Sequence, residues 1–153
     1  MEKIEFDDKL FSNIKDILQL SYEYVDTSSL IEIICVYISL EWVNFYDVIY
    51  KIENKFYERH KVDVVLKNAD ISIENQRILV RSVNEVIGNI RELFIQNHRE
   101  VPTQIKIIYS PVTGKNKVKF NYEKLHNDEL LIGDNDLAEE WFEELQAGNG
   151  DIE

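Results

Sequence analysis

The sequence predicts an α+β domain in which an antiparallel β-sheet of about five strands packs with an N-terminal helix, a long central helix and an acidic C-terminal helix. Apolar residues recur at helical spacing near both ends of the chain and in its centre. The segments between them are β-branched and aromatic, and they come in pairs with short connections, which favours antiparallel pairing. No repeat or linker divides the 153 residues. We therefore expect a single domain over residues 1–147 and a flexible acidic tail at 148–153.

The first half of the chain predicts one helix and two or three strands. The helix covers residues 5–24, and its apolar positions at helical spacing are Phe6, Leu10, Ile14, Ile17, Leu18 and Tyr22. Strands are expected over residues 30–40 and 43–52, with a third over Phe56–Lys61. Glu53, Asn54 and Lys55 would form the turn before that third strand. The alternation along these strands assigns their faces only loosely.

The clearest helix follows Ser72, which is a good N-cap, and Glu74 in its first turn suits the helix dipole. Its continuous apolar stripe consists of Leu79, Val83, Val86, Ile87, Ile90, Leu93 and Phe94. Gly88 inside this stripe costs about 1 kcal/mol relative to alanine. We therefore expect Gly88 to mark a close approach of the helix to the sheet.

After Pro102, two alternating segments predict a β-hairpin with strands over residues 105–109 and 118–122. Residues 110–114 between them supply serine, proline and glycine, which is turn chemistry. A polar loop through Gly133 then leads to the last helix, expected over residues 135–146.

Negative charge is concentrated at the C-terminal end. The net charge is −12, and residues 123–153 hold eleven acidic side chains and one basic one, whereas the first 122 residues hold 18 acidic and 16 basic ones. Such a surface repels phosphate backbones and attracts basic proteins. Nucleic-acid binding is therefore disfavoured, although lysines gather on the hairpin. We expect those lysines to line a solvent face and to pair with the acidic helix: Lys106, Lys115, Lys117 and Lys119.

The acidic block also contains large apolar side chains, and this combination suits a protein interface. We expect its carboxylates to meet cationic groups of a partner, with Trp141 or Phe142 as an anchor. The expected partner-binding residues are Asp134, Asp136, Glu139, Glu140, Trp141, Phe142, Glu143 and Glu144. An alternative remains equally open. In it, the last helix docks on its own domain and exposes its acids to water.

No constellation of residues predicts catalysis. His60, His98 and His126 stand apart, without a second ligand at zinc-binding spacing. The sequence has neither a Gly-x-Ser-x-Gly elbow nor a glycine loop for phosphate. We therefore expect no enzyme activity, no cofactor and no metal. An enzyme with a dispersed site has no support in these residues.

Cys35 is the single cysteine, and it lies within an apolar run that predicts a buried and inert thiol. The N-terminus lacks the apolar stretch of a signal peptide, and no segment is apolar enough to span a membrane. A cytoplasmic protein that does not bind membranes is the expectation.

One segment resembles a known family. Asp70–Ser72 leads into the long helix, which ends in Ile90–Phe94; a polar linker with Pro102 and the strand Val118–Tyr122 follow. This order is similar to that of the YezG-like family of bacterial antitoxin or immunity proteins, which neutralise secreted polymorphic toxins. The resemblance covers about a third of the chain, and the opening helix and first strands match in order and type only.

The resemblance implies a cognate toxin as partner, and the family's toxins include nucleases, whose basic surfaces would suit the acidic block. The expected function is thus neutralisation of a nuclease toxin by covering its active site or substrate groove. Two departures are visible. Thr103 stands where the family usually has a tryptophan, and arginines offset the acids of the long helix. The alternative function is a non-catalytic structural or adaptor domain with an acidic protein-binding surface.

Overall fold

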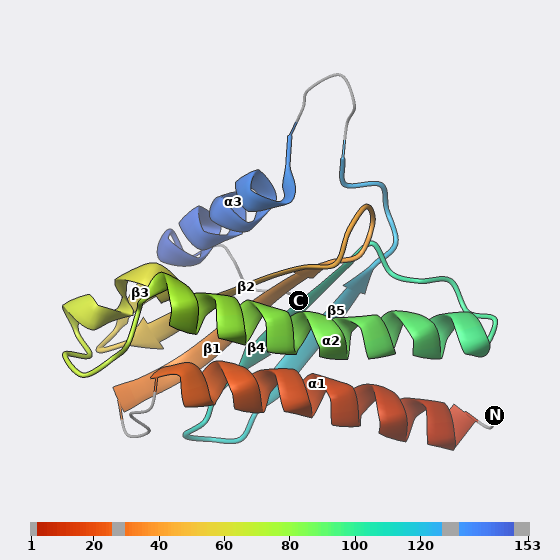
Figure 1. The fold of residues 1–153 in the computed structure, drawn as a ribbon, viewed down its shortest axis with the longest axis horizontal. Helices are drawn as coiled ribbons and strands as arrows, with labels where there is room; N and C mark the ends of the chain where they lie inside the picture. The colour runs from red at the N-terminus through yellow and green to blue at the C-terminus, as the bar shows by residue number, and fades with distance from the viewer. Residues whose placement is uncertain (1–2, 26–29, 127–131, 149–153) are drawn as a thin grey trace.

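The computed structural model describes residues 3–25, 30–126 and 132–148, and its five-stranded antiparallel sheet confirms the α+β class (Figure 1). The sheet has the order β3-β2-β1-β4-β5. In chain order the elements are α1 (Lys3–Val25), β1 (Ile31–Ser39), β2 (Phe45–Ile52), β3 (Lys55–Glu58), a 3-10 helix (Arg59–Val64), α2 (Ile73–Gln96), β4 (Gln104–Tyr109), β5 (Asn116–Asn121) and α3 (Asp134–Gln146).

Helices cover both faces of the sheet. α1 and α2 lie side by side and antiparallel on one face (Figure 1), and the rings of Phe6 and Phe94 meet edge to face where the start of α1 passes the end of α2. α3 packs on the opposite face, where it forms a second apolar cluster with the sheet. The larger core therefore lies under α1 and α2, and the C-terminal helix has a face of its own.

The central strand β1 explains why alternation assigned the faces so loosely. It pairs with β2 on one side and β4 on the other, and helices cover both its faces, so apolar residues occupy consecutive positions. Val36 belongs to the core under α1 and α2, whereas Cys35 and Tyr37 belong to the cluster under α3. Burial raises the pKa of the Cys35 thiol to about 12. The expected burial of Cys35 is confirmed, and its redox inertness stays a prediction.

The long helix α2 begins as its sequence predicts. Ser72 is the N-cap, and its hydroxyl accepts a hydrogen bond from the backbone N–H of Asn75 at 3.2 Å. The apolar stripe faces the core, with six residues buried and Val86 packed at its edge. The expected close approach at Gly88 is wrong. A Cβ added there would lie 3.9 Å from Nδ2 of Asn44, which is an ordinary contact.

Replacing Gly88 with alanine should therefore raise the free energy of unfolding by about 1 kcal/mol, because alanine fits and favours the helix. Urea denaturation of the full chain measures this. Gly114→Ala is the control, since Gly114 has a φ of +76° and no neighbour within 4 Å of an added Cβ. There the strained backbone should lower stability by about 1 kcal/mol. A loss of stability in both variants would contradict the open space at Gly88.

The turn residues of the β2–β3 and β4–β5 hairpins predicted the positions of both turns. Glu53 and Asn54, with φ of 51° and 66°, form a two-residue turn, and β3 starts at Lys55 rather than after it. The third strand is shorter than expected, because the chain turns into the 3-10 helix at Arg59. The turn over residues 110–114 is confirmed, and the last helix begins one residue earlier than predicted. Most of the expected acidic tail, residues 149–153, lies outside the described residues.

Candidate interaction surface

α3 holds to the sheet through one apolar stripe. Its buried residues are Ala138, Trp141 and Leu145, and they pack on Cys35, Tyr37 and Ile49 of the sheet. Trp141 is only 2% exposed, and its ring centroid lies 6.2 Å from that of Tyr37. Because an aromatic residue brings the largest buried area to such a stripe, Trp141 fixes how α3 lies on the sheet.

Most carboxylates of α3 lie on the side away from this stripe. The exposed ones are Asp136, Glu139, Glu140 and Glu143, while Asp134 and Glu144 are half-buried. Phe142 is also half-buried, packed at the edge of the cluster. The structure thus gathers the expected acidic residues on one helix. It places Trp141 inside the domain, where the free protein does not offer it to a partner.

Charge repulsion opposes the C-terminal half of α3, although Asp134 and Asp136 in its first turn suit the helix dipole. Glu139 and Glu143, like Glu140 and Glu144, lie four residues apart, and no basic residue balances the dipole in the last turn. Like-charge pairs at this spacing cost roughly 0.2–0.5 kcal/mol each. Burial of a large aromatic side chain contributes several times more. Packing of the apolar stripe therefore stabilises α3 against this repulsion. The same packing holds the acidic face in place.

One lysine of the hairpin lies beside this helix. The Nζ of Lys106 on β4 is 5.2 Å from the ring centroid of Trp141. Burial lowers the pKa of Lys106, and the nearby Glu144 acts in the opposite direction. Lys119 on β5 pairs with Lys106 in the sheet, so both side chains project on the face that α3 occupies. Lys106 is thus partly buried beside Trp141 and near Glu144, not on a solvent face, and an ion pair of the hairpin lysines with the acidic helix stays a prediction.

The first residue of α3 is tied to a buried histidine that sequence reasoning treated as isolated. His126 is 1% exposed, with Nδ1 at 2.5 Å from Oε1 of Glu41 and Nε2 at 2.8 Å from Oδ1 of Asp134. Glu41 precedes His126 by 85 residues, so no local pattern could reveal this contact. The cluster of Glu41, His126 and Asp134 thus connects the β1–β2 loop, the chain before α3 and α3 itself. In the parts of the chain that the structure describes, no group of three or more histidine, cysteine or acidic residues could hold a metal ion.

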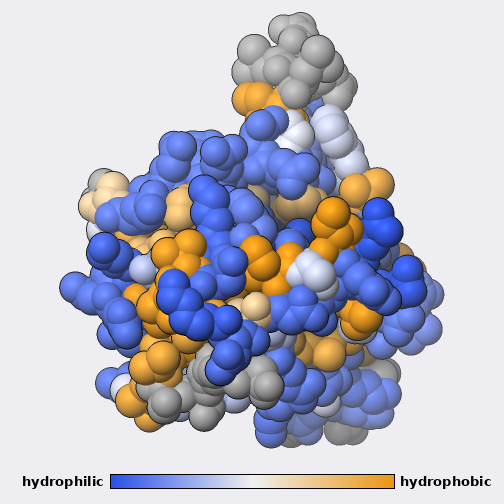
Figure 2. Space-filling model, turned by 60° about the vertical axis from the view of Figure 1, so that its left-hand side comes forward, coloured by the Kyte–Doolittle hydropathy of each residue, from blue (hydrophilic) through white to orange (hydrophobic). Residues whose placement is uncertain are grey.

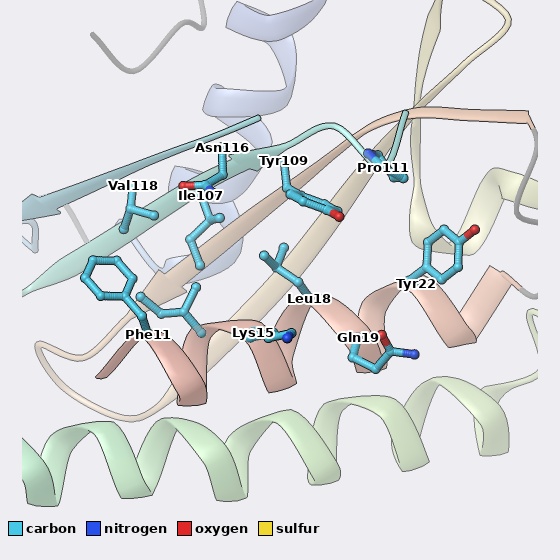
Figure 3. Close-up of a pocket in the computed structure, with 11 residues that line it drawn as sticks. Phe11, Lys15, Leu18, Gln19, Tyr22, Ile107, Tyr109, Pro111, Asn116 and Val118 are labelled. Carbon is cyan, nitrogen blue, oxygen red and sulfur yellow. The ribbon is translucent and has the colours of Figure 1, made fainter. Parts of the chain in front are cut away.

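A groove of about 510 Å³ lies on the other face of the sheet, between α1 and the β4–β5 hairpin (Figure 3). Phe11 and Leu18 project from α1 toward Ile107 and Tyr109, and Lys15 lies on the α1 side. The groove suits a small apolar group. It is the second candidate surface, and the sheet separates it from the acidic face of α3.

On the face shown in Figure 2, hydrophobic residues form small patches among hydrophilic ones, as on an ordinary protein surface. Across the described ranges, no helix has both the length and the apolar character needed to cross a bilayer.

Comparison with known proteins identifies the family. The family model described as "Immunity protein YezG-like" matches residues 28–141, a span that includes the whole sheet, α2 and most of α3. No curated protein matches the chain. The residues that carried the resemblance lie within the matched span. The match supports a general role in immunity, which implies binding of a cognate toxin. It covers most of the chain, and the protein therefore belongs to the YezG-like immunity protein family.

Proposed function

We propose that this protein neutralises a secreted bacterial nuclease toxin, and that it covers the toxin's active site or substrate groove with the acidic face of α3. The protein acts by binding and catalyses no reaction. In this proposal the two proteins meet in the cytoplasm of the cell that makes them. The observation that carries the proposal is the row of outward carboxylates on a helix that the domain core holds in place.

The charge of α3 supports a basic partner. A nuclease binds a polyanion, so the surface around its active site is positively charged. The face of α3 carries carboxylates and has no cation in the same helix. It therefore presents to the nuclease a negative field similar to that of the nucleic-acid substrate. Such complementarity raises the rate of encounter more than it raises the final affinity.

The packing of α3 supports a rigid interface. A partner that binds a preformed helix does not have to order it, which lowers the entropic cost of association. The same packing is what a structural or adaptor domain would need, because a helix that only covers the sheet would also bury Trp141. The two candidates differ in whether the exposed carboxylates affect binding of a toxin.

Mixing the purified full-length chain with the toxin domain encoded beside its gene tests the proposal. We expect a stable complex and loss of the toxin's cleavage of a nucleic-acid substrate as the chain is titrated in. A toxin domain that keeps full nuclease activity in the presence of excess chain would contradict the proposal. A toxin domain with a different enzymatic activity, inhibited on binding, would refute the nuclease assignment and leave the immunity role intact.

A further inference from the structure

The β1–β2 loop presents two apolar residues to solvent in the middle of a firmly held segment. Trp42 is 54% exposed and Val43 is 63% exposed, whereas their neighbours Glu41 and Asn44 are half-buried. Exposure of a large aromatic side chain has no benefit for the fold, because burial would stabilise it. Hydrogen bonds of the flanking residues Asn44 and Glu41 hold this pair outward.

Asn44 is held from the side of α2. Oδ1 of Asn44 accepts hydrogen bonds from Nε and Nη2 of Arg91, at 3.0 and 2.8 Å. The same Nη2 also donates to the carbonyl oxygen of Leu40 at 2.6 Å. One guanidinium group therefore fixes both ends of the loop, and its planar geometry sets the distance between them.

Glu41 is held from the side of α3. Its carboxylate accepts hydrogen bonds from the backbone N–H groups of Leu125 and His126, at 3.0 and 2.7 Å, and lies next to the His126 ring. Desolvation raises the pKa of Glu41, but these hydrogen bonds outweigh it and lower the pKa overall. Glu41 is therefore a carboxylate at neutral pH, and it ties the loop to Leu125 and His126 in the chain before α3.

Trp42 stacks on the ring that this network fixes. The ring centroids of Trp42 and His126 are 3.7 Å apart, with an angle of 16° between their planes. Stacking covers one face of the indole, and the exposure of Trp42 shows that much of the remainder is open. The carboxylates of Glu41 and Asp134 flank the imidazole beneath it. Trp42 is thus an exposed aromatic ring in a negative environment, held in one orientation.

We propose that Trp42 and Val43 are the anchor of the toxin interface, and that the open face of Trp42 receives an arginine or lysine side chain of the toxin. The inference rests on the proposed function and names the residue that fixes the complex. An aromatic face near carboxylates is the chemistry that binds a cation. Asp134 in the first turn of α3 is hydrogen-bonded to the His126 ring on which Trp42 stacks, so the anchor lies next to the acidic face. Rigid, exposed tryptophans are frequent hot spots in interfaces.

The test measures dissociation of the full-length chain from the toxin domain encoded beside its gene. Trp42→Ala should speed dissociation by at least about 30-fold, as loss of a hot-spot residue does. Trp42→Phe should have a smaller effect, because it keeps an aromatic face. Phe11→Ala is the matched control, since Phe11 is an aromatic residue of similar exposure, 49%, in the groove on the other face. Its dissociation rate should equal that of the wild type.

Oxidative footprinting of the wild type gives an answer that does not depend on how a variant folds. The chain has two tryptophans, and Trp141 is buried. Trp42 should be oxidised in the free protein and protected in the complex, while Trp141 should resist oxidation in both. A wild-type chain that binds the toxin without protecting Trp42, or a loss of binding in Phe11→Ala alone, would refute the anchor and leave the proposed function standing. A wild-type chain that does not bind the toxin would refute both.

Discussion

Trp141→Ala should lower the free energy of unfolding of the free protein by about 3–5 kcal/mol. The indole is 2% exposed and fills the space between α3 and Tyr37, so its removal leaves a cavity as well as losing buried area. A loss of this size is a large fraction of the stability of an ordinary domain. Thermal and urea denaturation of the purified variant measure it.

Two variants of neighbouring residues separate packing from contact with the toxin. Phe142→Ala should cost less than Trp141→Ala, because Phe142 is half-buried at the edge of the cluster. Glu139→Ala should leave the melting temperature nearly unchanged, since its side chain is exposed. If Trp141→Ala melted like the wild type but released the toxin faster, Trp141 would be a contact residue and the described packing of α3 would be wrong.

Reversing the charge of α3 should have the largest effect on the rate of association with the toxin. With Glu139, Glu140, Glu143 and Glu144 changed to lysine, association should slow by roughly 10- to 1000-fold at low salt. The difference from the wild type should shrink at 1 M salt, where the Debye length is about 3 Å. Stopped-flow measurements over a range of salt concentrations give both quantities.

The control must carry the same change in net charge elsewhere. Four exposed acids on the opposite side of the molecule serve for this, two on α1 and two on α2: Asp8, Asp16, Glu74 and Glu85. Reversing them should slow association far less, because α1 and α2 cover the face of the sheet opposite to α3. Equal slowing in both quadruple variants would show that overall charge, and not the face of α3, attracts the toxin. No slowing in either would remove the electrostatic basis of the proposal.

The fold could be predicted largely from local signals. The N-cap at Ser72, the apolar period of α2 and the glycine turn of the β4–β5 hairpin each act within a few residues, so the sequence displays them directly. The end of β3 was misplaced because Arg59–Val64 form a 3-10 helix, whose short period has no clear apolar signature. The faces of β1 were ambiguous because helices cover both of them.

The candidate surface was only partly predictable. The acidic composition of α3 was plain, but the side on which Trp141 lies follows from its spacing to Ala138 and Leu145, three residues before and four after. That period was present in the sequence and indicates a buried stripe. The network around Trp42 has no comparable signal, because Glu41 and His126 come together only when the whole sheet has formed. Two tryptophans that look alike in the sequence thus differ in exposure, 54% against 2%.

The way the β1–β2 loop is fastened has a consequence for how recognition can change over generations. Its backbone is fixed by the side chains of Glu41 and Asn44, together with Arg91 and His126, so the conformation of the loop depends mainly on residues other than Trp42 and Val43. Substitutions at Trp42 and Val43 can alter what the loop binds without a large loss of stability. An immunity protein must keep binding its toxin while the sequence of the toxin changes. In this loop, the residues that hold the backbone differ from the residues that would contact the partner. The partner can therefore be exchanged one substitution at a time, with each intermediate still folded.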